Sequence, residues 1–149
     1  MSASDLSLFA LEGIPLISEG DNVGNIIAEA LSLSKQELED GDVLVLAQKI
    51  VSKAEGRAVR LGTVEPSPQA RKLAAEVDKD PRVIELILGE SRQVIRKKPG
   101  VVIVEHLLGY VLANAGIDRS NVQSDEDWVL MLPVDPDGSA ERIRKILQD

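Results

Sequence analysis

An uninterrupted apolar run, Val43-Leu44-Val45-Leu46-Ala47, constrains the fold of this chain more than any other feature. Successive side chains of a strand point to opposite faces of a sheet, so an all-apolar strand has to be covered on both faces. The run follows Gly41-Asp42, which suits the turn that leads into a strand. The sequence therefore predicts a buried strand over residues 43–47, inside a sheet that is flanked by helices.

The remaining segments predict helices and strands in a mixed order. Residues 6–11 alternate apolar with small or polar residues, as a half-buried strand does. Asp21 is a candidate N-cap of a helix that extends to about Leu33. Ser67-Pro68 and Asp80-Pro81 each place an N-cap residue before a proline at the first helical position. Further strands are predicted around residues 59–61, 94–95, 101–104, 110–112 and 128–132, and a last helix after Asp137 or Ser139.

This order predicts the fold class. Strands and helices interleave in the first part of the chain, and strands cluster after the two helices that begin with proline. We therefore expect an α+β fold, or an α/β fold with an antiparallel part, with a mixed sheet and flanking helices in a single domain.

Composition excludes several functional classes. The 149 residues include 17 Lys and Arg against 25 Asp and Glu, a net charge of −8, whereas nucleic-acid binding needs a basic surface. No apolar run approaches the roughly 18–20 residues of a membrane span, and residues 1–5 lack the basic start of a secretory signal. The chain has no cysteine, which excludes disulfides and fits a reducing compartment. We expect a cytoplasmic protein that binds neither nucleic acid nor membrane.

Lys49, Lys53 and Arg57 form the first candidate site. They recur every four residues directly after the predicted strand 43–47, so a helix would place them on one face. Ligands of open α/β sheets gather at the carboxyl ends of strands, and a local positive stripe suits a nucleotide phosphate. The alternative is a solvated basic face paired with Glu55, and spacing alone favours that alternative.

A second candidate lies in the loop over residues 114–121. Asp118, Ser120 and Asn121 offer oxygen ligands of the kind that Mg²⁺ takes. The alternative is a turn in which Asp118 and Asn121 bond their own backbone, and the loop taken alone favours it. The stretch 135–139 could also hold a metal, but we assign it to a turn and helix cap. His106 is the single histidine and is expected to be a surface or structural residue rather than a catalytic one.

Taken together, several stretches resemble one family, the coenzyme F-420 gamma-glutamyl ligases. The stretches occur in the family's order with compatible spacing, and the resemblance extends over nearly the whole chain. They are Leu11-Glu12-Gly13-Ile14-Pro15-Leu16-Ile17 with Glu19-Gly20-Asp21, Asp40 to Val45, Ile50 to Arg57, Asn114 to Val122, and Leu132-Pro133 with Asp135 to Ala140.

The resemblance implies a function. Members of this family attach L-glutamate to the lactyl carboxylate of the coenzyme precursor, using GTP and a divalent cation, Mg²⁺ or Mn²⁺. The expected intermediate is an acyl phosphate, which the glutamate amine attacks. Phosphoryl transfer of this kind depends on cations around the phosphates and needs no cysteine or histidine nucleophile. The resemblance also implies a homodimer with small-molecule substrates.

The resemblance also implies roles for individual residues. Glu12, Gly13, Ile14 and Pro15 would line the GTP site with backbone groups. Lys53 would contact GTP, and Gln48 and Lys49 occupy positions that also touch the nucleotide. Asp118 would be a metal ligand, and Asn121 would hold GTP near it.

The sequence departs from the family at its C-terminal end. Family chains continue into a strand that ends in an Asp-Thr pair and then a Gly-Arg stretch, which supply the other metal ligands. The last helix here also lacks a stop signal before Asp149. We therefore expect the N-terminal portion of a ligase, incomplete as an enzyme by itself. The alternative is a non-catalytic nucleotide-binding or dimerisation module derived from the family.

Overall fold

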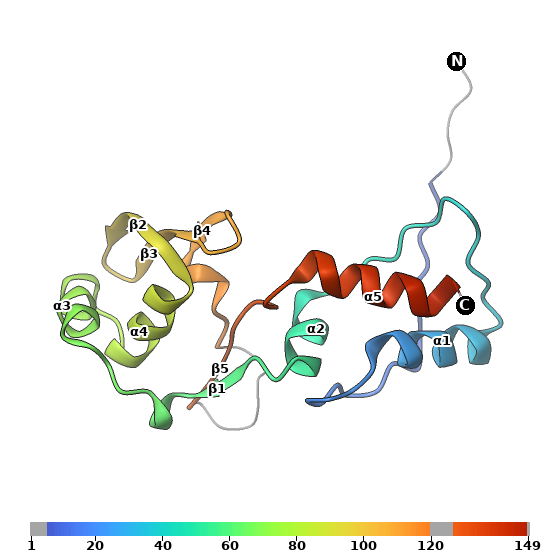
Figure 1. Ribbon diagram of the computed structural model, residues 1–149, viewed down its shortest axis with the longest axis horizontal. Helices are drawn as coiled ribbons and strands as arrows, with labels where there is room; N and C mark the ends of the chain where they lie inside the picture. The colour runs from blue at the N-terminus through green and yellow to red at the C-terminus, as the bar shows by residue number, and fades with distance from the viewer. Residues whose placement is uncertain (1–5, 120–126, 149) are drawn as a thin grey trace, which may run out of the picture.

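The computed structural model describes residues 6–119 and 127–148. Figure 1 shows two halves joined by a narrow two-stranded ribbon. The ribbon pairs β1 with β5 in antiparallel register, with Val59 opposite Val129. The ribbon strands are β1 (Ala58–Arg60) and β5 (Trp128–Leu130), and a 3-10 turn, η1 (Leu61–Thr63), follows β1.

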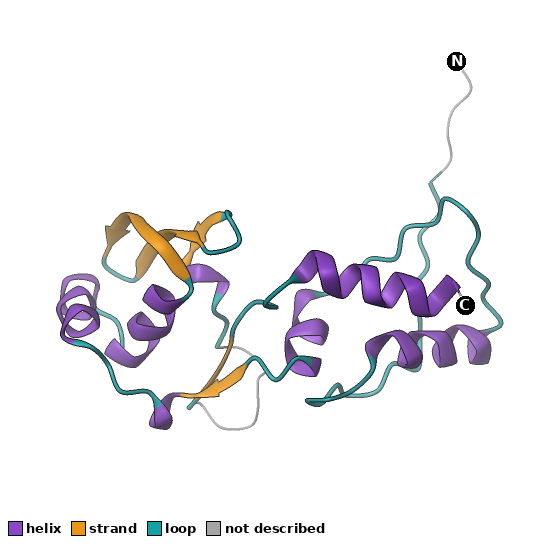
Figure 2. Ribbon diagram, viewed as in Figure 1, coloured by secondary structure: helices purple, strands orange, loops and turns teal. Residues whose placement is uncertain are grey.

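One half packs two helices against a three-stranded sheet (Figure 2). Its strands pair in the order β2-β3-β4, and both pairs are antiparallel. Val102 and Val104 of β3 face the helices and are fully buried, together with Ile84 and Ile87. The elements of this half are α3 (Pro68–Val77), α4 (Pro81–Gly89), β2 (Ser91–Lys98), β3 (Val101–His106), β4 (Val111–Ala113) and η2 (Asn114–Gly116).

The other half is helical. Its elements are α1 (Val23–Ser34), α2 (Gln48–Ala54) and α5 (Pro136–Gln148). Val23 and Ile27 of α1 pack against Ile143 of α5 and form the centre of a second apolar cluster. Gly24 lets the two helices approach closely, because a Cβ at this position would lie 2.7 Å from Ile146 Cδ1. None of the helices over residues 6–119 and 127–148 is both long and apolar enough to cross a membrane.

The helix starts show which sequence signals were correct. Ser67 and Asp80 cap α3 and α4 as predicted, accepting from the N–H groups of Ala70 and Arg82. The stretch 135–139 forms a turn and helix cap as predicted, but the individual cap residues predicted for the first and last helices, Asp21 and Asp137 or Ser139, are wrong. Asn22 caps α1, because the Asp21 carboxylate instead accepts the N–H of Ser18. Asp135 accepts the N–H of Gly138 at 3.0 Å and leaves Pro136 at the first position of α5.

The predicted α+β class is confirmed, and the strands later in the chain form β2, β3, β4 and β5. The described strand pairs are antiparallel and lie in two small sheets rather than in one mixed sheet. Two predicted strands are wrong for the described residues, because residues 6–11 and 43–47 are extended without a partner strand. An apolar run favours a strand, but a strand also needs a neighbour to pair its backbone groups.

Candidate functional site

Helix α2 carries three of the predicted site residues. Ile50, Val51 and Ala54 pack against the second apolar cluster, so this side of the helix faces inward. Gln48 and Lys53 are half-buried on the rest of the helix. The Gln48 side chain is engaged within the helix, because its Oε1 accepts the hydroxyl of buried Ser52 at 2.8 Å. Gln48 can therefore offer a ligand its amide NH₂ group and the second lone pair of Oε1.

Lys49 and Asp118 are brought together from sequence positions far apart. Lys49 Nζ lies 2.6 Å from Asp118 Oδ2, and both side chains are about one-third exposed. Asp118 is fixed through its backbone, which exchanges two hydrogen bonds with Leu130, at 2.9 and 2.8 Å. This β-bridge to Leu130 adds Asp118 to the β1–β5 ribbon and places its carboxylate beside the first turn of α2. The two residues predicted as nucleotide and metal ligands thus form one charged pair.

Lys53 lies one helical turn beyond Lys49. Within residues 6–119 and 127–148 its side chain has no ion pair or hydrogen bond. A half-buried ammonium group without a carboxylate partner is available to an anionic ligand. Lys49 and Lys53 therefore differ, since only Lys49 is held by a carboxylate.

The predicted stripe does not include Arg57. Helix α2 ends at Ala54, and Gly56 turns the chain with a φ of +65°. Arg57 Nε then donates to Leu132 O at 2.8 Å, and Arg57 Nη2 lies 2.8 Å from Glu90 Oε2. Its guanidinium group joins the end of β5 to the end of α4, so Arg57 is structural here.

His106 lies beside the Arg57–Glu90 pair and is buried, so of the two expected settings the structural one applies and the surface one does not. Its Nδ1 accepts the N–H of Leu108 at 3.0 Å, which leaves the proton of the neutral ring on Nε2. Nε2 lies 3.5 Å from Glu90 Oε2. Burial lowers the pKa of His106; Glu90 opposes this shift and Arg57 adds to it. The ring is therefore neutral at pH 7 and holds the end of β3.

The segment Glu12–Pro15 lies against the same cluster as α2. Ile14 packs into that cluster, while Glu12, Gly13 and Pro15 are exposed. Gly13 has a φ of +83°, and a Cβ there would meet no atom within 4 Å, so space is open beside its backbone. The Gly20 N–H donates to Ala54 O at 2.9 Å and ties the following loop to α2. The segment can thus offer backbone groups to a ligand near α2.

Glu55 fixes the other end of α2. Its carboxylate accepts the N–H of Val134 at 3.1 Å and a short hydrogen bond from the Ser139 hydroxyl. Arg142 Nη2 lies 3.7 Å from the same carboxylate. Glu55 therefore joins α2 to the start of α5. From the sequence, Glu55 is expected only to pair with neighbouring basic side chains, because no local pattern indicates a contact with α5.

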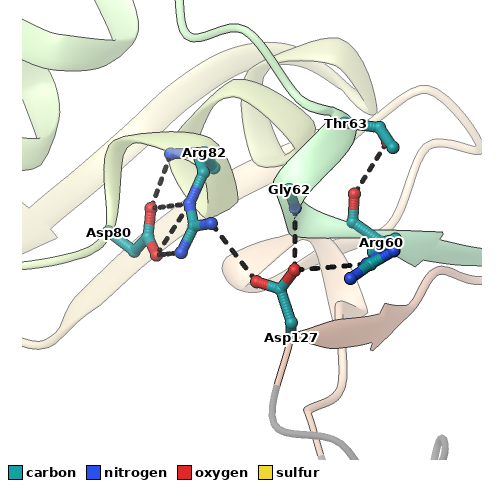
Figure 3. Close-up of polar contacts among 6 residues, drawn as sticks. All are labelled: Arg60, Gly62, Thr63, Asp80, Arg82 and Asp127. Carbon is teal, nitrogen blue, oxygen red and sulfur yellow. Dashed lines mark hydrogen bonds and ion pairs between the residues drawn. The ribbon is translucent and has the colours of Figure 1, made fainter.

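Asp127 braces the chain where it enters β5 (Figure 3). Its Oδ2 accepts the Gly62 N–H at 3.0 Å and lies 3.6 Å from Arg60 Nε, while Oδ1 lies 3.2 Å from Arg82 Nη1. Arg82 is held in turn by Asp80, whose pKa is lowered by that hydrogen bond. The sequence gives no local sign of this role, because Gly62 and Arg82 lie 65 and 45 positions earlier in the chain.

Asn121, the remaining predicted nucleotide ligand, lies outside the described residues, as does Ser120. The described residues do not fit a divalent metal by themselves. They contain no group of three or more His, Asp or Glu side chains placed to hold an ion. Asp118 is the single predicted ligand, and a cation at its carboxylate would share that carboxylate with the Lys49 ammonium group, which contacts Oδ2.

Comparison with known proteins identifies the family. A family model described as F420-0:Gamma-glutamyl ligase matches residues 13–149. The chain belongs to this family. The predicted site residues on α2, residues 13–15 and Asp118 fall inside the match, and Glu12 lies directly before it.

Individual relatives agree. The coenzyme F420:L-glutamate ligase of Methanothermobacter thermautotrophicus is 46% identical over 144 residues, which are 97% of this chain and 56% of the relative. The proteins of the same description from Methanopyrus kandleri and Archaeoglobus fulgidus are 43% and 42% identical over 97% and 94% of this chain. The chain spans about half the length of these relatives.

Proposed function

We propose that this chain forms the nucleotide-binding part of a GTP-dependent ligase that adds L-glutamate to the coenzyme F-420 precursor. The family match and the relatives' names support the ligation of glutamate. The observation that carries the nucleotide site is the position of Lys53, half-buried and without an anionic partner among the described residues, one turn from the Lys49–Asp118 pair.

The proposed chemistry has two steps. A lactyl carboxylate oxygen attacks the γ-phosphorus of GTP, and the bond to the β-phosphate bridging oxygen breaks, which gives an acyl phosphate and GDP. The glutamate amine then attacks the acyl carbon and loses a proton, phosphate leaves, and an amide remains. Phosphoryl transfer depends mainly on positioning and on charge stabilisation.

The residues of this chain would contribute cations and backbone donors to the first step. The Lys53 ammonium group would balance negative charge on the transferred phosphoryl group. The Lys49 ammonium group would have the same role, and its ion pair with Asp118 would keep it in position. The backbone of residues 12–15 would bind GTP beside them. Mg²⁺ or Mn²⁺ would add charge at the phosphates when bound. Asp118 would give it one carboxylate, with the other ligands coming from outside the described residues.

The experiment requires a longer protein. We call it the family-length chain and define it as this chain joined to the part of the Methanothermobacter thermautotrophicus relative that lies outside the 144 aligned residues. It is incubated with GTP, Mn²⁺, L-glutamate and the coenzyme precursor, and the glutamylated product is measured by mass spectrometry. Product that depends on GTP supports the proposal. No product from a folded family-length chain with Lys53 and Asp118 intact contradicts it.

Variants of Lys53 test the site itself. Lys53→Met removes one cation at the phosphates and should lower turnover at least about tenfold, whereas Lys53→Arg should retain most of it. Lys98→Met is the matched control, because Lys98 is an exposed lysine at the end of β2 in the other half of the molecule. Equal losses in Lys53→Met and Lys98→Met would remove Lys53 from the site.

The proposal also includes the setting of the enzyme. We expect a cytoplasmic homodimer that acts on small molecules and binds no nucleic acid, as the acidic charge of −8 suggests. Light scattering of the family-length chain measures the oligomeric state.

A further inference from the structure

Two extended segments expose apolar side chains in the helical half of the molecule. Leu8 and Phe9 are 86% and 77% exposed, and Val43 and Val45 are 83% and 81% exposed. Both segments have the residue pattern of strands. Within the described part of the chain, no backbone–backbone hydrogen bond joins residues 6–11 or 43–46 to another residue. Folded proteins rarely leave neighbouring apolar side chains of this size in water.

The ends of the two segments are already anchored. Leu11 and Leu46 pack against the second apolar cluster, so each segment enters the helical half at a fixed point. Within the two runs, the large apolar side chains before Leu11 and before Leu46 are exposed. The two runs are therefore exposed because they have no partner strand among the described residues, whereas the helices beside them are folded and packed.

We propose that residues 6–11 and 43–47 are β-strands of a sheet whose partner strands come from the part of the family-length chain outside the match. Nearly half of each relative lies outside the match. A run that is apolar at every position needs cover on both faces, which a sheet inside one polypeptide supplies. This inference rests on family membership and is independent of the proposed ligase activity.

The pairing would have a consequence for the candidate site. Residues 6–11 lead directly into Glu12–Pro15, and residues 43–47 lead directly into Gln48 and α2. Pairing of the two strands would fix both segments where the strands end, at the sheet edge where ligands of α/β proteins bind. The site segments would thus be ordered together with the sheet.

Hydrogen exchange of backbone amides tests the pairing. In the 149-residue chain, we expect residues 6–11 and 43–46 to exchange at nearly unprotected rates. In the family-length chain, protection of both segments should rise by more than about 100-fold. Unprotected segments in a folded family-length chain would overturn the inference. Protection in the short chain that rises with protein concentration would also overturn it, since a second copy would then be the partner.

A pair of variants gives an independent test. Val45→Asp should leave the melting temperature of the short chain unchanged and lower that of the family-length chain by at least about 5 °C, because a charge would be buried. Val111→Asp is the control, since Val111 is 63% exposed on β4 in the other half. Equal effects of both variants in the family-length chain would contradict the proposal. If Val45→Asp does not fold there, Val45→Thr replaces it with a smaller expected loss.

Discussion

Lys49 Nζ contacts Asp118 Oδ2 at 2.6 Å, although about half of the described chain separates the two residues. Lys49 is placed by α2 and Asp118 by its backbone bridge to Leu130. The contact brings a predicted nucleotide ligand and the predicted metal ligand into one pair. The strength of this ion pair can therefore be measured in the protein without any ligand.

A double-mutant cycle with Lys49→Met and Asp118→Asn should give a coupling energy of about 0.2–1 kcal/mol. Both side chains are about one-third exposed, so water screens the attraction. Urea unfolding of the four proteins measures the free energies. The Arg144–Glu141 pair of α5 is more exposed and serves as the reference, with an equal or smaller coupling. A Lys49–Asp118 coupling above about 2 kcal/mol would indicate a desolvated pair instead.

Stability should fall as the pH drops below about 6.5, in part because of His106. Burial lowers the pKa of this residue, so the unfolded chain takes up a proton at a pH where the folded chain does not. This contribution to stability is complete above the unfolded value of about 6.5 and is lost as pH falls toward the folded value. Chemical unfolding at several pH values between 5 and 8 measures the slope.

His106→Asn is the matched variant for this slope. Its Oδ1 can still accept the Leu108 N–H, while the titrating ring is gone. The variant should be less stable overall but should depend less on pH between 5 and 7. Should the variant not fold, the NMR titration of the wild-type ring decides, and a pKa above 6.5 would contradict the prediction.

Gly24→Ala should destabilise the chain by about 1–3 kcal/mol, because the new methyl group would clash with Ile146 between α1 and α5. Gly89→Ala is the control. Gly89 is also in a helix, α4, but a Cβ there meets no atom within 4 Å, so this change should be neutral or stabilising by up to about 1 kcal/mol. Thermal unfolding measures both. Similar effects at the two positions would show that the helices do not pack closely at Gly24.

Asp127→Ala should cost about 1–2 kcal/mol of folding free energy, because Gly62, Arg60 and Arg82 all lose a charged partner (Figure 3). Glu141→Ala is the control. It removes an exposed carboxylate that pairs with Arg144 and Lys145 within α5, and it should cost less than about 0.5 kcal/mol of folding free energy. Denaturant unfolding compares the two variants. A loss at Asp127 no larger than at Glu141 would mean that Asp127 does not brace the ribbon.

Local signals predicted the parts of the fold that depend on few residues. Ser67-Pro68 and Asp80-Pro81 start helices because the cap and the fixed proline geometry act within one turn. The predicted strand at residues 101–104 lies within β3, and in the structure Val102, Val104 and His106 share one buried face of it. The family resemblance, which the match over residues 13–149 confirms, predicted site residues on α2 and at Asp118.

The errors arose where a residue's role depends on distant partners. Arg57 continues the four-residue spacing of Lys49 and Lys53, yet Glu90 and Leu132 hold it away from them. The run Val43–Ala47 has the pattern of a buried strand but lies exposed for most of its length, because no described segment pairs with it.

The sequence by itself determined the starts of α3 and α4, the strand at residues 101–104, the α+β class and the family, since each depends on local chemistry or on residue identity. Only the tertiary structure decided that Lys49 pairs with Asp118, that Lys53 has no such partner among the described residues, and that Asp127 braces the ribbon. These contacts join residues that are tens of positions apart. Their formation depends on packing of the whole chain, because no local pattern encodes which distant side chain arrives beside them.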